Sequence, residues 1–237
     1  MIISIIQPCF IPWLGYFEQI EIGDVFVYLD DVQYTKKDWR NRNKLKTAYG
    51  IKNIHVPVQK TNRDTLIKDV LISYNEPWQK NIENKLTEWY KKSPYFNEVM
   101  ELITPLIHTR YEKLVELNYH LNLAIMNYMG IHTPIRFSSE VPKNTDDKNL
   151  RIIEICQYFN ADVLYDGKSA QNFIDTETFR QQGIEIIFQD YQHTPYQQLH
   201  DDFVPYMSVI DLIMNEGKQA KSIIMSSPLP NKISYRL

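Results

Sequence analysis

The sequence predicts an α/β protein, built on a parallel Rossmann-like sheet with an inserted helical subdomain. Short β-branched runs alternate along the chain with stretches whose apolar residues recur at helical spacing. Strands separated by a helix pair in parallel through right-handed crossovers, so this order favours a parallel sheet. Residues 77–129 break the alternation, because their periodicity is helical throughout. The predicted division is therefore an α/β domain of residues 1–76 and 130–237, and a helical subdomain of residues 77–129.

The first unit of the sheet is predicted at the start of the chain. Residues 2–6 (IISII) are apolar and mostly β-branched, which is typical of a short buried strand. Trp13 and Phe17 then recur at helical spacing, and Gly23 ends that helix. A second apolar run, residues 25–29 (VFVYL), predicts the neighbouring strand.

The middle of the chain is predicted to hold two more strands and three helices. Residues 51–58 alternate apolar and polar side chains, and residues 70–73 are typical of a short edge strand. Within residues 77–129, three helices are separated by breaks, one of them at Pro94, and the last helix stops at Gly130. Their apolar stripes indicate packing in a core rather than a cofactor site.

The α/β order resumes after Gly130. Strands are predicted at residues 134–139, 161–165 and 184–188, and helices at residues 146–158, 176–182 and 208–215. Gly183 separates the second of these helices from the last strand. This half of the chain therefore supplies the remaining strands of the predicted sheet.

The composition is that of an ordinary globular protein. The 237 residues are 43% hydrophobic and 23% charged, and the net charge of −3 gives no general attraction to nucleic acid. Cys9 and Cys156 are too few for a disulfide framework or a zinc site. The first apolar run is far shorter than a membrane-spanning helix and no basic leader precedes it. We therefore expect a cytoplasmic protein without membrane insertion.

Polar side chains follow the first two predicted strands. Gln7 comes after the first strand, and Asp30, Asp31 and Gln33 come after the second. In parallel sheets the ligand crevice lies outside the carboxyl ends of the strands, so these acids and amides are predicted to share one rim. A pair of acids alone is typical of a turn, whereas the whole set favours a site.

A cationic, amide-rich segment comes next. Arg40, Arg42 and Lys44 alternate with Asn41 and Asn43. Paired guanidinium groups suit a diphosphate or a carboxylate, because each planar fork donates two parallel hydrogen bonds. The alternative is a solvated loop, which is usual for a charge run. The position after a rim strand favours phosphate binding.

Three further candidate residues lie near the ends of predicted strands. Lys168 and Ser169 belong to a Gly-Lys-Ser run that lacks the first glycine of a phosphate loop, GxxxxGK[ST], so that motif is not predicted. A lysine and a serine at the carboxyl end of a strand can still touch a phosphate. Cys9, between two prolines, acts as a nucleophile only beside a positioned base, and the sequence identifies none.

His193 and Tyr196 belong to a late polar stretch. A neutral imidazole near pH 7 is a natural general base for an attacking ammonium group. The alternative, a turn histidine at the end of the last strand, fits the pattern equally well. The spacing of the other histidines predicts no zinc or iron site; Mg²⁺ held by Asp30 or Asp31 with substrate phosphates stays an open alternative.

Taken together, these motifs resemble the WbqC-like family. The resemblance rests on residues 7–17 (QPCFIPWLGYF), 29–33 (LDDVQ) and 39–44 (WRNRNK), and continues through 195–198 (PYQQ) and 208–213 (SVIDLI). Relatives often have histidine before the Gln-Pro pair, where this chain has Ile6, so a mechanism that needs that imidazole fails here. The family is associated with bacterial O-antigen and capsule gene clusters. The resemblance therefore implies an enzyme acting on amino-sugar precursors.

The function that this resemblance implies is that of a transferase of surface-polysaccharide biosynthesis. It acylates or aminoacylates the amine of a nucleotide-linked amino sugar, using an activated acyl donor or ATP with Mg²⁺. The catalytic candidates are His193 and Asp30. The diphosphate is bound by Arg40, Arg42 and Lys44, and the sugar is oriented by Gln7, Asp30 and Gln33. A ring of the substrate stacks on Trp13 or Tyr16, and the substrate site is completed by Asp31, Asn41, Lys168, Ser169 and Tyr196.

Two other classes of function compete with this one. The first is a non-catalytic binding or scaffold subunit of a polysaccharide-assembly complex, and the second is a Mg-dependent nucleotidyltransferase. The oligomeric state is left open. The central spatial prediction is that the proline-rich loop after the first strand, the paired acids and the cationic segment meet at one pocket.

Overall fold

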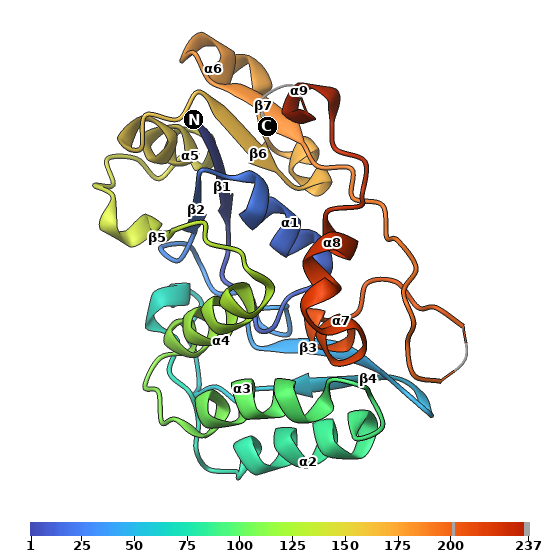
Figure 1. Cartoon of the computed structure of the whole chain (residues 1–237). Coiled ribbons are helices and arrows are strands. Elements are labelled where there is room, and N and C mark those ends of the chain that lie inside the picture. Colours follow the sequence, from blue (N-terminus) through green and yellow to red (C-terminus); the bar gives the residue numbers. More distant parts are fainter. Residues whose placement is uncertain (201, 235–237) are drawn as a thin grey trace.

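The computed structural model describes residues 1–200 and 202–234, and it contains a five-stranded parallel sheet (Figure 1). The strand order is β5-β2-β1-β6-β7. The strands are β1 (Ile2–Ile6), β2 (Val25–Tyr28), β5 (Ile135–Phe137), β6 (Val163–Asp166) and β7 (Glu185–Phe188). Every neighbouring pair in this sheet is parallel, so the prediction of an α/β protein with a Rossmann-like sheet is confirmed.

Apolar residues on both faces of the sheet are buried. The connecting helices are α1 (Leu14–Ile22), α5 (Lys148–Tyr158) and α6 (Thr176–Gln181). Ile5 and Val27, paired across β1 and β2, belong to one apolar cluster, whereas Phe26 belongs to a second cluster with Phe17 of α1. This alternation follows from the two-residue period of a strand. It explains why the strands consist of almost uninterrupted apolar runs, as expected for a sheet covered on both faces.

The ends of the helices follow local rules. Asp147 precedes α5, and its carboxylate accepts hydrogen bonds from Asn149 N and Leu150 N, each at 2.9 Å. Gly130 follows α4 (Leu114–Met129) with a φ of 73°, the left-handed conformation that glycine adopts without strain. The stop predicted at Gly130 is therefore confirmed.

An antiparallel hairpin follows β2 in the chain and precedes the helical block. It consists of β3 (Arg42–Thr47) and β4 (Gly50–His55). The second half of the cationic segment is thus a paired strand, and the solvated-loop alternative is wrong for residues 42–46. Residues 70–73, predicted as an edge strand, form only isolated bridges.

The helical block packs into the main core. It consists of α2 (Trp78–Tyr90), α3 (Phe96–His108) and α4, as the periodicity predicts. Leu86 of α2 lies in the same apolar cluster as Leu45 of the hairpin, Phe26 of the sheet and Ile213 near the end of the chain. A single cluster therefore links the sheet, hairpin and helical block. The division into two domains stays a prediction.

The remaining helices among the described residues are short. These are η1 (Ile67–Asp69), η2 (Ser138–Glu140), η3 (Lys168–Asn172), α7 (Val209–Glu216), η4 (Gly217–Gln219), α8 (Ala220–Ile224) and α9 (Asn231–Ser234). Helix α7 packs against β3 and α3, which brings the late part of the chain back to the hairpin (Figure 1). Among the described residues, none of the helices combines the length and apolar character needed to cross a membrane.

Candidate functional site

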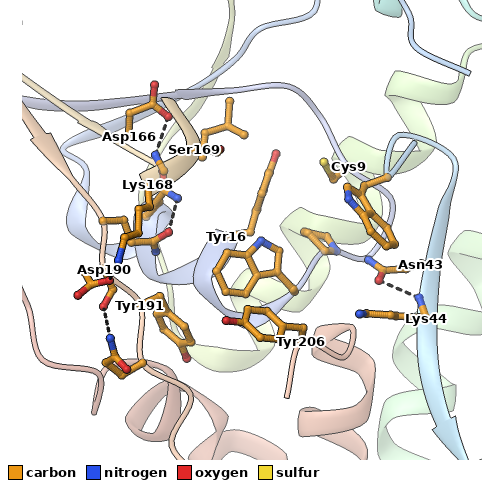
Figure 2. Close-up of a pocket in the computed structure, with 18 of the residues that line it drawn as sticks. Cys9, Tyr16, Asn43, Lys44, Asp166, Lys168, Ser169, Asp190, Tyr191 and Tyr206 are labelled. Carbon is orange, nitrogen blue, oxygen red and sulfur yellow. Dashed lines mark hydrogen bonds and ion pairs between the residues drawn. The ribbon is translucent and has the colours of Figure 1, made fainter. Parts of the chain in front are cut away.

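A cavity of about 690 Å³ lies where strands of the sheet end and the hairpin begins. Its wall includes Ile6 at the end of β1, Asp166 at the end of β6, Gln189 just after β7, and Lys44 of β3. This is the place where open parallel sheets bind ligands, outside the carboxyl ends of the strands. Figure 2 shows Asp166, Lys168 and Ser169 at one side of the cavity and Asn43 and Lys44 at the other.

The loop after β1 is fixed from two sides. Asn43 of β3 donates through Nδ2 to the carbonyl oxygens of Phe10 and Ile11, at 3.1 and 2.9 Å. Asn122 of α4 donates to Cys9 O at 3.0 Å. Ile11 has a φ of 37°, unusual for a β-branched residue, and these bonds hold the loop in that conformation. The loop is thus a rigid part of the cavity wall.

Aromatic rings form one side of the cavity. The Trp13 ring centroid lies 5.4 Å from that of Tyr191 and 5.8 Å from that of Tyr206, and all three residues line the cavity. Gly15 makes room for the indole, because a Cβ there would lie 2.3 Å from its Cη2 atom. Trp39, 46% exposed, adds another ring at the cavity, with Lys44 Nζ 5.9 Å from its centroid. Flat aromatic rings of this kind suit a base or a sugar.

Cationic side chains reach the cavity from two directions. Arg40 comes from the segment before β3, Lys44 from β3 itself, and Lys168 from η3. Lys168 forms an ion pair with Asp190, with Nζ and Oδ1 2.6 Å apart. Arg40 donates to Asp38 at 3.1 Å, while its buried Nε has no partner among the described residues. These cationic side chains therefore offer hydrogen-bond donors to an anionic group of a ligand in the cavity.

Cys9 also lines the cavity, but as a buried thiol. Arg40 Nη1 lies 3.2 Å from its sulfur. Burial raises the pKa of Cys9, and Arg40 opposes that effect only in part. The thiol form is therefore favoured at neutral pH, which gives little support to covalent catalysis.

Asp166 is an acid of this cavity that is not among the predicted site residues. It is the last residue of β6, its Oδ1 accepts a hydrogen bond from Gly167 N at 2.6 Å, and it lines the cavity. Burial raises its pKa from 3.8 to about 6, and the hydrogen bond from Gly167 offsets only part of that rise. The signal was present in the sequence, because the strand-end argument applied to Asp30 applies equally to Asp166.

Two buried glutamines lie beside Asp166 in the cavity wall. Gln19 Nε2 donates to Gln189 Oε1 at 2.7 Å, and Gln189 Nε2 donates to Gly15 O at 2.7 Å and to Glu18 Oε2 at 2.6 Å. Burial raises the pKa of Glu18 to about 7, although hydrogen bonds from Tyr165 and Gln189 act in the opposite direction. These residues gave no sequence signal, because their partners lie far along the chain.

Six of the predicted site residues line this cavity, and eight do not. The six are Trp13, Tyr16, Arg40, Lys44, Lys168 and Ser169. The eight are Gln7, Asp30, Asp31, Gln33, Asn41, Arg42, His193 and Tyr196. The proline-rich loop and the cationic segment therefore meet at one pocket, as predicted, but the paired acids do not join them.

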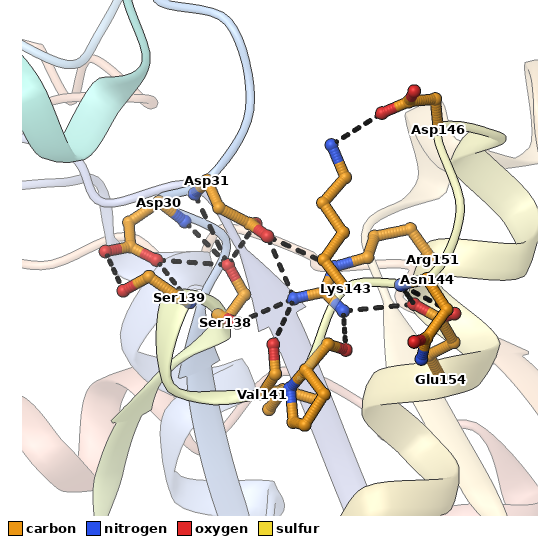
Figure 3. A network of polar contacts seen from close by, with 11 residues as sticks. Asp30, Asp31, Ser138, Ser139, Val141, Lys143, Asn144, Asp146, Arg151 and Glu154 are labelled. Atoms are coloured by element: carbon orange, nitrogen blue, oxygen red, sulfur yellow. Dashed lines mark hydrogen bonds and ion pairs between the residues drawn. The ribbon is translucent and has the colours of Figure 1, made fainter.

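The paired acids lie instead in a network at the end of β2 (Figure 3). Asp31 Oδ2 accepts from Arg151 Nη2 at 2.8 Å and from its Nε at 3.1 Å. Asp30 accepts from Ser139 N at 2.9 Å and from Ser139 Oγ at 2.8 Å, and both acids contact the Ser138 hydroxyl. The placement of Asp30 and Asp31 at the pocket is thus corrected, because their oxygens tie β2 to the segment after β5 and to α5.

A smaller cavity of about 410 Å³ adjoins that network. Asp31, Ser139, Lys68 and Lys143 are among the residues that line it. Among the described residues, no group of three or more His, Cys, Asp or Glu side chains is placed to hold a metal ion. A role of Asp30 or Asp31 in binding Mg²⁺ stays a prediction.

The four amide and cationic residues outside the large cavity have other surroundings. Asn41 Nδ2 donates to Val56 O at 2.8 Å, which extends the pairing of the hairpin. Gln33 is bonded to Arg63 O in an exposed loop. Arg42 begins β3 opposite His55, and Gln7 lies just beyond β1. Their substrate contacts stay predictions without support from the cavity.

Neither His193 nor Tyr196 lines the cavity, although His193 packs against aromatic residues that do. The His193 ring packs on Tyr206 at 4.3 Å and on Trp13 at 5.5 Å between centroids, and neither ring nitrogen has a partner among the described residues. Burial lowers the pKa of His193 to about 4, with a further contribution from the charge of Lys44. Tyr196 donates to Asp211 at 2.7 Å. His193 as the base stays a prediction, and its surroundings favour it less than those of Asp166.

Comparison with known proteins gives two matches. Residues 7–223 match the model of a family described as the WbqC-like protein family. The chain is 35% identical over 221 residues to the "Uncharacterized protein Rv1507c" of Mycobacterium tuberculosis, an alignment that covers 92% of this chain and 95% of that protein. No solved structure matches the chain.

Proposed function

Because the chain belongs to the WbqC-like protein family, we propose that it is a transferase of surface-polysaccharide biosynthesis that acts in the cytoplasm. The reaction is acyl or aminoacyl transfer to the amine of a nucleotide-linked amino sugar. The amine nitrogen bonds to the carbonyl carbon of an activated acyl donor, either a thioester or a mixed phosphoric anhydride. The bond from that carbon to sulfur or phosphate oxygen breaks, the leaving group keeps the electron pair, and the nitrogen releases a proton as the amide forms.

The observation that carries this proposal is the division of one cavity into two chemical ends. Cationic Arg40 and Lys44 lie at the hairpin end, and Asp166 and the glutamine amides lie at the end formed by β6 and β7. A nucleotide-linked amino sugar has the matching division, with an anionic diphosphate and a cationic amine. Arg40 and Lys44 would therefore hold the diphosphate, which leaves the amine at the acidic end.

The aromatic rings fit the remaining parts of such a ligand. Trp13 and Tyr206 lie at the cavity and offer flat apolar surface to a base or to the face of a sugar ring. The cavity volume of about 690 Å³ is within the range of small-molecule and cofactor sites. The sugar and acyl parts would then meet near Asp166.

A ligand panel followed by a turnover assay tests the proposal. Melting temperatures are measured with dTDP- and UDP-linked amino-dideoxyhexoses, with the free nucleotides and with acyl thioesters, because a ligand of the native state raises the melting temperature by mass action. We expect the amino-sugar nucleotides to give the largest rise, and N-acylated product to form when a donor is added. Binding without turnover with any donor would favour the binding-subunit alternative, and release of pyrophosphate with Mg²⁺ would favour the nucleotidyltransferase.

A further inference from the structure

The acidic end of the cavity has the chemistry of an ammonium site. Asp166 has a hydrogen bond from the backbone of Gly167, and the nearby lysine, Lys168, is engaged by Asp190 at 2.6 Å. No ion pair within the described ranges 1–200 and 202–234 involves Asp166. A carboxylate that lines a cavity without a cationic partner is a place where a ligand's cation can bind.

The glutamines beside Asp166 add acceptors to the same wall. Gly15 O is an acceptor only, so the Gln189 atom 2.7 Å away must be its amide nitrogen. The oxygen of Gln189 therefore faces Gln19, and the Gln19 atom 2.7 Å from it must also be nitrogen. This leaves Gln19 Oε1, buried and without a partner among the described residues, as an acceptor in a residue that is 3% exposed.

We propose that Asp166 binds the ammonium group of the acceptor substrate and takes a proton from it so that the amine can attack, with Gln19 orienting that group. This inference rests on the proposed function. The bound ammonium first gives one proton to an Asp166 carboxylate oxygen, which frees the lone pair of the nitrogen. That lone pair forms the new bond to the acyl carbon, and the leaving group departs with the electron pair of the broken bond and takes up the second proton that the nitrogen loses. Asp166 is then the catalytic residue, and Gln19 is a positioning residue.

The charged groups around Asp166 are compatible with this role. Lys168 and Asp190 pair with each other, and the thiol of Cys156 on α5 is near enough for its pKa to be raised further by the Asp166 charge, after the larger effect of burial. Glu18 is held by Tyr165 and Gln189 and does not line the cavity. Asp166 is therefore the carboxyl group at this wall that is free to exchange a proton with a ligand.

Kinetics of Asp166→Asn give the first arm of the test. We expect kcat to fall by roughly 10²- to 10⁴-fold, the usual contribution of a positioned general base, while the KM for the nucleotide sugar changes much less. The acidic limb of the wild-type rate profile, with a midpoint near pH 6, should be absent from the residual activity of the variant. Asp166→Glu should restore part of the rate.

Binding of matched ligands gives the second arm, which does not need turnover. The probes are a dTDP-linked 4-amino-4,6-dideoxyhexose and its 4-hydroxy counterpart, titrated by calorimetry at pH 7.5. The wild type should prefer the amine by about tenfold to a hundredfold, the usual strength of a hydrogen bond to a charged group. Asp166→Asn should lose this preference. Gln157→Met, a change at an exposed glutamine of α5 bonded to Gln182, should retain it.

The outcomes separate this inference from the proposed function. If Asp166→Asn loses the preference for the amine but the wild type acylates no substrate, the ammonium site is supported and the proposed transferase activity is wrong. A correctly melting Asp166→Asn protein with unchanged kcat and unchanged preference would overturn the assignment of Asp166. A wild-type protein that binds none of the nucleotide sugars contradicts both.

Discussion

The carboxyl ends of β2 and β6 both have acidic residues, but the two ends differ in how those acids are satisfied. At β2, Asp30 and Asp31 accept bonds from two serines and from Arg151, whose side chain is 5% exposed. At β6, Asp166 accepts one backbone hydrogen bond and otherwise lines the large cavity. The first arrangement is a closed structural link, and the second leaves a carboxyl group available to a ligand.

The comparison shows that position at a strand end is not sufficient to identify a site. Arg151 also donates to Ser138 O at 2.7 Å and Val141 O at 3.0 Å, so its charge is satisfied by the same segment that it crosslinks. A carboxylate with such a partner already has its charge balanced within the fold. A structural acid therefore differs from a functional one in whether the fold provides hydrogen-bond and ion-pair partners for its carboxylate.

The largest expected effect is at the closed end. Arg151→Met removes the partner of Asp31, which is 7% exposed, and leaves an uncompensated carboxylate in the protein. We expect a loss of about 3–5 kcal/mol in the free energy of unfolding, measured by urea denaturation at pH 7. Arg180→Met, at an exposed arginine paired with Glu177 on one helix, should leave the stability unchanged. Equal stability of the two variants would contradict the distinction between the two ends.

The next effect has the opposite sign and lies at the open end. Because the folded protein raises the pKa of Asp166 from 3.8 to about 6, the folded state holds this proton more tightly than the unfolded state does. The contribution of Asp166 to stability is therefore present below pH 3.8 and is lost as the pH rises through 6. Asp166→Asn should then be more stable than the wild type at pH 8, by up to about 3 kcal/mol.

Thermal or urea unfolding at several pH values measures this difference. The gain in Asp166→Asn should shrink as the pH falls through 6 and vanish below 3.8. Asp146→Asn is the matched control, because Lys143 lowers the pKa of that exposed aspartate, so the control should give no gain at pH 8. A destabilised Asp166→Asn protein at pH 8 would indicate that the carboxylate is held by the fold after all.

The sequence predicted more of the fold than of the site. The apolar runs and their helical spacers determine the parallel sheet, and the stop at Gly130 follows from its lack of a side chain. Trp13 of the loop after β1, and Arg40 and Lys44 of the cationic segment, line the cavity as predicted, because strand ends and local motifs are visible in a single sequence. These predictions depend on short stretches of chain.

The features of the site that a single sequence does not show depend on contacts between residues far apart in the chain. Nothing near Asp31 in the sequence indicates that Arg151 will neutralise it. Likewise, Lys168 is separated by 22 positions from Asp190, its partner in the structure. Gln19 and Gln189 are likewise far apart in the chain and come together only in the folded structure. The acidic end of the cavity could therefore not be predicted from the sequence.

The most direct test of the account compares two lysines, one at each cavity, by calorimetric titration with a dTDP-linked 4-amino-4,6-dideoxyhexose. Lys44 lines the large cavity beside Trp39, and Lys143 lines the small cavity beside Asp31. We predict that Lys44→Ala weakens the affinity by about tenfold, as expected for the loss of a charge-assisted hydrogen bond, and that Lys143→Ala changes it by less than about twofold. The reverse pattern, with affinity lost in Lys143→Ala and kept in Lys44→Ala, would place the ligand at the end of β2 and contradict the account.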